Sequence, residues 1–200
     1  ITLLLLSLAP TMHGQVVINE VLTSNSTVLA DEDGSYEDWV ELYNRGTSAV
    51  NLNGYGLSDD ATLPLKWTFP NVSIGAGQYL LIWCSDKNRR IPGSPLHTNF
   101  KLTSAGEAVL LSTAAGVLVN SSPATASLQN ISIGRSPNGT GNFLFFGIPT
   151  PNTANTTQSY TETLAPPVFS QSSGFVTAGF SLSISSTISG ASIIYTLDGS

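Results

Sequence analysis

Short apolar runs, separated at close intervals by turn-forming residues, make up most of the chain. The run YLLIWC, for example, follows SIGAGQ, in which Gly and Ser permit a tight turn. No segment sustains the apolar repeat of 3.6 residues that an amphipathic helix requires. The pattern therefore predicts an all-β antiparallel sandwich or barrel, with strands at 16–22, 39–44, 50–52, 66–69, 78–84, 108–112, 117–120 and 127–133.

The order of the segments predicts two β units joined by a linker. Residues 147–167 are rich in Pro, Thr and Asn and poor in apolar residues, which is typical of an extended linker. We place the first sandwich at 15–155, the linker at 156–167 and a second β unit at 168–200. In the second unit Phe180, Leu182 and Ile184 alternate with serines. About 33 residues cannot close a sandwich core, so this unit is predicted to be the N-terminal part of a small sandwich.

The first ten residues, ITLLLLSLAP, have the length and composition of the apolar region of a signal peptide. The small residue Gly14 suits a cleavage before Gln15, so residues 1–14 are predicted to be a signal peptide. A buried first strand and a transmembrane anchor are the alternatives, but the run is shorter than the roughly 20 residues that span a bilayer. We therefore expect a secreted or cell-surface protein without a membrane span.

Charge and cysteine usage restrict the partners and the cross-links. The net charge is −6, which argues against nucleic acid as a partner, because duplex-binding domains present a basic face. The basic segment DKNRR at 86–90 is interpreted as a solvated loop. The single cysteine, Cys84, excludes a disulfide within the chain, and its apolar surroundings in sequence predict burial.

The segment DWVELYN predicts a strand with two different faces. Val40 and Leu42 fall on one face, while Trp39, Glu41 and Tyr43 fall on the other. Large aromatic side chains within strands contribute mainly by burial. We therefore interpret the tryptophans of the chain as structural rather than as a sugar-stacking face; they are Trp39, Trp67 and Trp83.

The preceding acidic segment DEDGS is interpreted as a turn. Gly34 suits a positive φ, and the Asp31 and Asp33 carboxylates can accept hydrogen bonds from turn N–H groups. The alternative is a calcium site formed by Asp31, Asp33 and Asp38. The spacing and the distal Glu of a calcium-binding loop are absent, which makes this the weaker hypothesis.

The sequence contains none of the common catalytic motifs, such as G-x-S-x-G, H-E-x-x-H, a phosphate-binding P-loop or C-x-x-C. Of the two histidines, His13 lies in the predicted signal peptide, so a Ser-His-Asp triad would depend on His97 alone. We interpret His97 as structural. Arg135 could bind an anion, although a salt bridge to Glu41 is the simpler expectation. We therefore predict no catalytic residue, no cofactor and no enzymatic activity for these residues.

Several motifs together resemble the lamin-tail domain in its bacterial secreted form. They are VVINEVLTSN, DWVELYN, NLNGYGLSDD, HTNFKLTSAGE, GRSPNG and PTPNTAN, in this order between about residues 16 and 155. The resemblance implies an immunoglobulin-like β-sandwich without a catalytic centre. The loop CSDKNRRIPGSP departs from the usual Gly- and Ser-rich turn of the family. Some lamin-tail proteins bind nucleic acid, but the charge of this chain opposes that function.

The segment GASIIYTLDGS resembles the small β-sandwich at the C-terminus of chitobiase-like and hexosaminidase-like enzymes. The two resemblances imply a non-catalytic interaction or structural module at the N-terminus of a multidomain protein. A protein or a surface polysaccharide is the expected partner. The alternative is an accessory region of a larger enzyme, such as a spore-coat-H-like kinase or a hydrolase.

Overall fold

The computed structural model describes residues 14–164 and 166–196, so the predicted signal peptide lies outside the described residues except for Gly14. The described residues fall into two compact units that divide between Thr161 and Glu162. They form strands, turns and loops, and none of them belongs to a helix that could cross a membrane. The predicted all-β fold is confirmed.

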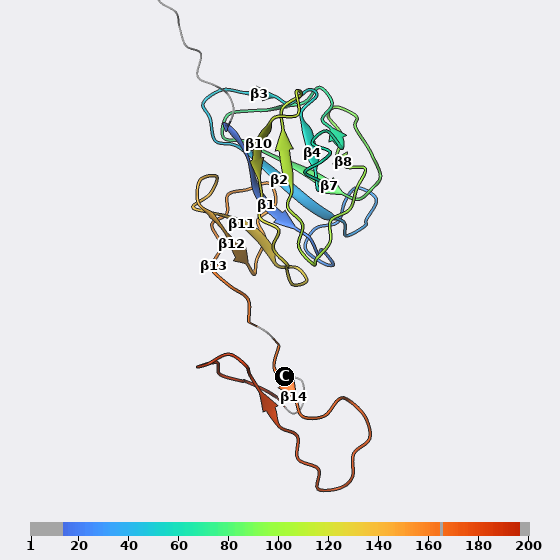
Figure 1. Ribbon diagram of the computed structural model, residues 1–200, viewed down its shortest axis with the longest axis vertical. Helices are drawn as coiled ribbons and strands as arrows, with labels where there is room; N and C mark the ends of the chain where they lie inside the picture. The colour runs from blue at the N-terminus through green and yellow to red at the C-terminus, as the bar shows by residue number, and fades with distance from the viewer. Residues whose placement is uncertain (1–13, 165, 197–200) are drawn as a thin grey trace, which may run out of the picture. The chain divides into compact units, whose positions relative to one another are not determined.

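Two main sheets build the first unit (Figure 1). The large sheet has the order β13-β12-β11-β1-β2-β7-β8, and the small sheet has the order β10-β9-β4-β5; β3 and β6 form a separate pair. Neighbouring strands are antiparallel except β7 and β8, which are parallel. The bounds are β1 (Val16–Leu22), β2 (Asp38–Asn44), β3 (Val50–Asn51), β4 (Gly56–Ser58), β5 (Trp67–Thr68), β6 (Ser73–Ile74), β7 (Tyr79–Cys84), β8 (Leu96–His97), β9 (Leu110–Ser112), β10 (Leu118–Ser121), β11 (Ser132–Ser136), β12 (Asn142–Phe146) and β13 (Ser159–Tyr160).

The core of the first unit lies between the two sheets. The large sheet contributes side chains such as Ile18, Leu42 and Ile82, and the small sheet contributes Leu57 and Leu111, all of them fully buried. Each such side chain stabilises the fold by about 1.5–3 kcal/mol through burial. The alternation predicted for DWVELYN is confirmed, because Val40 and Leu42 enter this core and the residues between them do not.

The outer face of the large sheet carries a second apolar cluster. Leu22, Trp39 and Trp83 are buried there, beneath Val28 and Leu29 of the loop that follows β1. Trp67 lies in the main core, so all three tryptophans are buried and the structural interpretation of them is confirmed. A sheet that is covered on both faces explains why β1 is buried along its whole length.

The sequence placed the end of the sandwich incorrectly. The strand predicted at 127–133 begins only at Ser132, because Asn130 adopts a φ of +60° in a turn. The next strand, β12, was not predicted. The segment interpreted as a linker begins inside the sandwich, since Phe145–Phe146 of β12 pairs with Ser159–Tyr160 of β13. Residues 147–161, which we call the strap, therefore belong to the first unit.

The second unit contains one strand pair, β14 (Val168–Phe169) with β15 (Ile184–Ser185). Of the predicted apolar face, Phe180 and Leu182 are exposed and Ile184 is half-buried. Residues 162–164 and 166–196 thus bury little apolar surface. That residues 168–200 are the N-terminal part of a small β-sandwich stays a prediction.

Candidate functional site

A bulge in β1 creates the most constrained polar site of the first unit. The pairing of β1 with β2 shifts register between Ile18 and Glu20, which makes Asn19 the extra residue of a β-bulge. In a regular strand Ile18 and Val21 would face opposite sides, yet both lie in the main core. The bulge therefore turns both Asn19 and Glu20 toward the outer face of the large sheet.

Arg135 stabilises the main chain of the bulge. Its Nε donates to the carbonyl oxygen of Ile18 (2.9 Å), and its Nη1 donates to that of Gly141 (2.9 Å). Its guanidinium also lies 4.5 Å from the centre of the Phe143 ring. The salt bridge expected between Arg135 and an acid such as Glu41 is not formed, because Arg135 donates to the carbonyl oxygens of Ile18 and Gly141 and to Asn120 Oδ1 (3.2 Å). Glu41 instead accepts from Asn19 and Asn152.

On the outer face, a network of polar groups holds the strap against the sheet. We call this group the polar latch; its members are the buried residues Asn19, Glu20, Glu41, Thr150 and Asn155, the half-buried Asn138, and Asn152, which contributes its main-chain N–H. Asn19 is its centre, donating to Glu41 Oε1 (2.9 Å) and Asn155 Oδ1 (3.2 Å) and accepting from the N–H of Gly139 (3.0 Å). Asn155 Nδ2 in turn donates to the carbonyl oxygens of Asn19 (3.1 Å) and Arg135 (3.0 Å).

The two carboxylates of the polar latch bind the main chain of the strap. The N–H of Thr150 donates to Glu20 (3.1 Å to Oε1), and the hydroxyl of Thr150 donates to Glu20 Oε2 (2.9 Å). The N–H of Asn152 donates to Glu41 Oε2 (2.5 Å). Ser132 Oγ donates to Glu20 Oε1 (2.5 Å), the oxygen that also accepts from the N–H of Thr150. The motifs INE, DWVELYN, GRSPNG and PTPNTAN thus meet in one network.

Both glutamates are fully buried, and burial controls their ionisation. Desolvation, together with the nearby charge of Glu20, raises the pKa of Glu41 to about 8, although the hydrogen bonds from Asn19 and Asn152 act in the opposite direction. Desolvation also raises the pKa of Glu20, against the hydrogen bonds from Ser132 and Thr150.

A second polar group joins the loop before β2 to the loop after β7. We call it the acid–base cluster; its members are Asp31, Glu32, Asp33, Lys87, Arg89 and His97. Lys87 pairs with Asp31 and with Asp33 (2.8 Å), and Arg89 pairs with Asp33 (2.6 Å) and Glu32 (2.5 Å). In the basic segment 86–90, Lys87 and Arg89 are thus paired with acids, while Arg90 donates to the hydroxyl of Thr68 (2.6 Å).

Asp31 has the turn-capping role that the sequence predicted. Its Oδ1 accepts from the N–H of Asp33 (3.0 Å) and of Ser35 (2.9 Å), while Gly34 adopts a φ of +82°. Desolvation alone would raise the pKa of Asp31, but Lys87 and the two N–H donors outweigh it and lower that pKa. The interpretation of DEDGS as a turn is confirmed.

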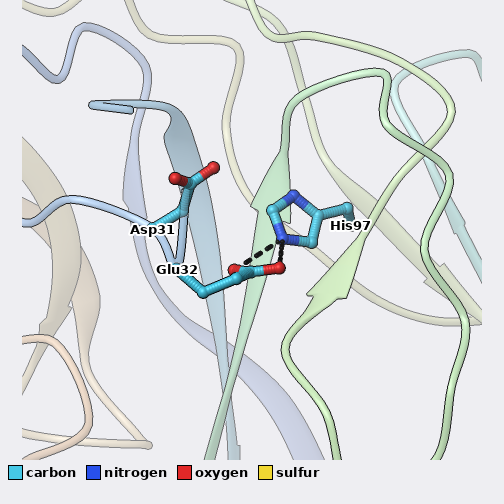
Figure 2. A group of neighbouring side chains, drawn as sticks. All are labelled: Asp31, Glu32 and His97. Atoms are coloured by element: carbon cyan, nitrogen blue, oxygen red, sulfur yellow. Dashed lines mark hydrogen bonds and ion pairs between the residues drawn. The ribbon is translucent and has the colours of Figure 1, made fainter. Parts of the chain in front are cut away.

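His97 lies between a serine and a glutamate. Its Nδ1 is 2.7 Å from Ser85 Oγ, and its Nε2 is 3.0 Å from both carboxylate oxygens of Glu32 (Figure 2). The connectivity resembles a serine-hydrolase triad with the two ring nitrogens exchanged. Ser85 is only 4% exposed, so its hydroxyl is enclosed by the surrounding chain. The arrangement positions the two loops, which agrees with the structural interpretation of His97.

Within the part of the chain that the structure describes, Asp31, Glu32 and His97 are close enough to share a metal ion, with ligand atoms within 4.8 Å of one another. Lys87 and Arg89 already occupy the carboxylates of Asp31 and Glu32. Of the calcium candidates predicted from the sequence, Asp31 and Asp33 both pair with Lys87, and Asp38 accepts from the N–H of Asn25 (2.9 Å). A calcium site at Asp31, Asp33 and Asp38 stays a prediction.

A groove of about 350 Å³ runs beside β7, next to the acid–base cluster. Its walls include Tyr79, Leu81 and Trp83 of β7 and Pro95 of the loop before β8. The lining also includes Asp31, Glu32 and Ser94, so the groove mixes apolar and polar walls and offers a concave surface for contact.

The fold and these sites define a β-sandwich in which buried polar groups join distant segments of the chain. The family model of the lamin tail domain matches residues 9–123, which is more than half of the chain, so the chain belongs to the lamin tail domain family. The sandwich is accordingly of the immunoglobulin-like type, as the sequence motifs implied. No curated protein matches the chain.

Sequence reasoning identified neither the polar latch nor the partners within the acid–base cluster. The residues of the latch come from β1, β2, the turn between β11 and β12, and the strap, and Thr150 follows Glu20 by 130 positions. The only sequence signal was indirect, because the motifs that carry the family resemblance are the ones that supply the latch.

Proposed function

We propose that the chain is a non-catalytic interaction or structural module of a secreted or cell-surface multidomain protein. The observation that carries this proposal is the use of its buried polar groups. Glu20 and Glu41, the carboxylates with the most unusual environment, bind main-chain N–H groups of the strap instead of facing a cavity. Catalytic carboxylates need access to a substrate, whereas these two stabilise the fold.

The acid–base cluster supports the same function. Its carboxylates are paired with Lys87 and Arg89, and the hydroxyl of Ser85 is enclosed beside His97. A lamin tail domain with an immunoglobulin-like fold typically presents loops and edges to partners. A protein or a surface polysaccharide is the partner class that we infer. The apolar N-terminus supports an extracytoplasmic setting, and the resemblance to the bacterial secreted form of the lamin-tail domain supports a bacterial one.

The second candidate is an accessory region of a larger enzyme, with a spore-coat-H-like kinase or a hydrolase as the catalytic partner domain. It is favoured by the second β unit, whose GASIIYTLDGS segment is similar to a module of glycoside-processing enzymes. The sequence of the complete gene distinguishes the two candidates.

Turnover assays on the purified chain test the absence of catalysis. We expect no hydrolysis of glycoside or phosphodiester substrates and no consumption of ATP above a heat-inactivated control. The surface variant Lys101→Ala serves as the matched control. Turnover that is lost in His97→Ala but kept in Lys101→Ala would refute the proposal. Binding is tested separately by titrating soluble cell-wall polysaccharides and following main-chain NMR signals.

A further inference from the structure

The strand β7 is paired along only part of its length on the side of β8. Its partner there has two residues, and the pairing involves Ile82 and Trp83. On the other side β2 pairs with every residue of β7. The exposure of β7 follows the same division, because Tyr79–Leu81 are half-buried and Ile82–Cys84 are buried. The first half of β7 is therefore an edge of the large sheet.

The main-chain groups of this edge point toward the position of a further strand. In an antiparallel pair, successive residues direct their N–H and C=O groups alternately toward the partner strand and away from it. The N–H of Thr98 donates to the C=O of Trp83 (2.8 Å), so the main-chain groups of Trp83 face the β8 side. Leu81 and Tyr79 precede Trp83 at steps of two residues and face the same side. An extended segment laid along them continues the sheet in line with β8.

The groove of about 350 Å³ beside β7 opens at this edge. Its lining contains the consecutive residues Tyr79, Leu80 and Leu81, whose side chains point to alternate faces, so the groove reaches the edge of the strand itself. Pro95 adds a wall from the loop CSDKNRRIPGSP, which departs from the usual turn of the family. The volume is near the lower limit for ligand pockets, about 300–1,000 Å³, and suits the side chains of a short peptide.

The charged residues that line the groove are acidic. Among the described residues, Asp31 and Glu32 belong to the lining, whereas no Lys, Arg or His does. The side chain of Glu32 remains 33% exposed although it pairs with Arg89 and His97. Arg89 has a second carboxylate partner in Asp33 (2.6 Å), so a cation that binds Glu32 does not leave Arg89 unpaired. The groove is therefore complementary in charge to a basic side chain.

We propose that this edge and groove bind an extended peptide of a partner protein, with an apolar residue two positions from a Lys or Arg. The main chain of the peptide pairs with Tyr79 and Leu81, its apolar side chain contacts Pro95 in the groove, and its cation binds Glu32 on the same face. A polysaccharide is the poorer fit, because Trp83 is only 5% exposed and offers no free ring face for stacking. The proposal rests on the proposed function, since it names the partner class of a non-catalytic module.

Titration of the full chain with short peptides, followed by main-chain NMR signals, tests the proposal. The probes are Thr-X-Thr-Lys-Thr-Thr and Thr-Lys-Thr-X-Thr-Thr, with Val, Leu or Phe at X. We expect saturable shifts of the Tyr79 and Leu81 amides and no shift at Tyr160 in β13, the edge strand at the other end of the sheet. Replacing Lys by Glu in the peptide should weaken binding about two- to fivefold, as for a partly exposed ion pair.

Two matched comparisons separate strand pairing from side-chain contact. Alternate N–H groups of a paired peptide face β7, so N-methylation of one alternate set should abolish binding and N-methylation of the other set should preserve it. Glu32→Gln should remove the difference between the Lys and Glu peptides, whereas Glu162→Gln, on an exposed residue of the second unit, should keep that difference. The N-methylated peptides need only the wild-type chain, so they test the proposal even where Glu32→Gln does not fold.

The proposal is overturned when none of the peptides shifts the Tyr79 and Leu81 amides, when Lys and Glu peptides bind equally, or when both N-methylated sets behave alike. It is also overturned when soluble cell-wall polysaccharides shift these amides and the peptides do not. Dimerisation that shifts the same amides, detected by sedimentation, would show a second copy of the chain on the edge instead. The turnover assays test the non-catalytic module independently, so a failure of peptide binding and a failure of the proposed function are distinguishable.

Discussion

The strands that follow the matched family region should be indispensable for folding. The family model ends at residue 123, yet β11 pairs with β1 inside the large sheet and β12 pairs with β11. We compare two fragments, 14–123 and 14–161, that differ only in β11, β12 and the strap. The longer fragment is one compact unit in the structure.

The structure indicates how much stability the shorter fragment loses. Ile133 and Phe146 are buried, and burial of each such side chain stabilises the fold by about 1.5–3 kcal/mol. Glu20 and Asn19 also lose hydrogen-bond partners and become exposed to water. The lost apolar burial alone amounts to about 3–6 kcal/mol, which is a large share of the typical stability of a whole domain, about 5–15 kcal/mol.

Thermal unfolding followed by far-ultraviolet circular dichroism provides the measurement. We expect fragment 14–161 to show a β spectrum and one cooperative transition, and fragment 14–123 to show no cooperative transition. If 14–123 melted cooperatively within about 5 °C of the longer fragment, the assignment of β11 and β12 to the stabilising sheet would be refuted.

Three further predictions concern single positions. Gly134→Ala places a Cβ 2.6 Å from Nδ2 of Asn155 and should lower the free energy of unfolding by about 1–3 kcal/mol. In the control Gly147→Ala the new Cβ meets nothing within 4 Å, so the free energy of unfolding should change by less than about 0.5 kcal/mol. Urea titrations of the two variants measure the difference. Cys84 is buried, and desolvation raises the pKa of its thiol, so a thiol reagent should react with it only after unfolding. Rapid labelling of the native protein would contradict the burial of Cys84. Emission from the three tryptophans should be blue-shifted and resist acrylamide, and quenching by an added glycan would instead indicate a sugar-binding face.

The fold could be predicted wherever local patterns dominate. β1 was predicted with its observed ends, and the alternation of DWVELYN gave the correct faces, because side chains in a strand must alternate. Gly34 marked its turn because glycine adopts a positive φ without strain. These features depend on residues that are neighbours in the sequence.

The errors have a common physical origin. The strap is poor in apolar residues and was interpreted as a linker, yet Thr150 and Asn155 are buried because carboxylates and amides from other strands satisfy them. Hydropathy reports the cost of burying polar groups but not the partners that offset it. The same limitation hid the pairing of Lys87 with Asp33, residues that are 54 positions apart.

The bulge residue of β1 contributes to the attachment of the strap but not to the regular pattern of core-facing residues in the strand. Asn19 is an inserted residue: without it, Val16, Ile18 and Val21 would still face the core, and Glu20 would still face outward in a regular strand. The sheet does not require this residue, but the strap does, because Asn19 contacts Glu41, Asn138 and Asn155. Loss of Asn19 would therefore remove these side-chain contacts, while the hydrogen bonds from Thr150 to Glu20 and from Asn152 to Glu41 do not depend on it.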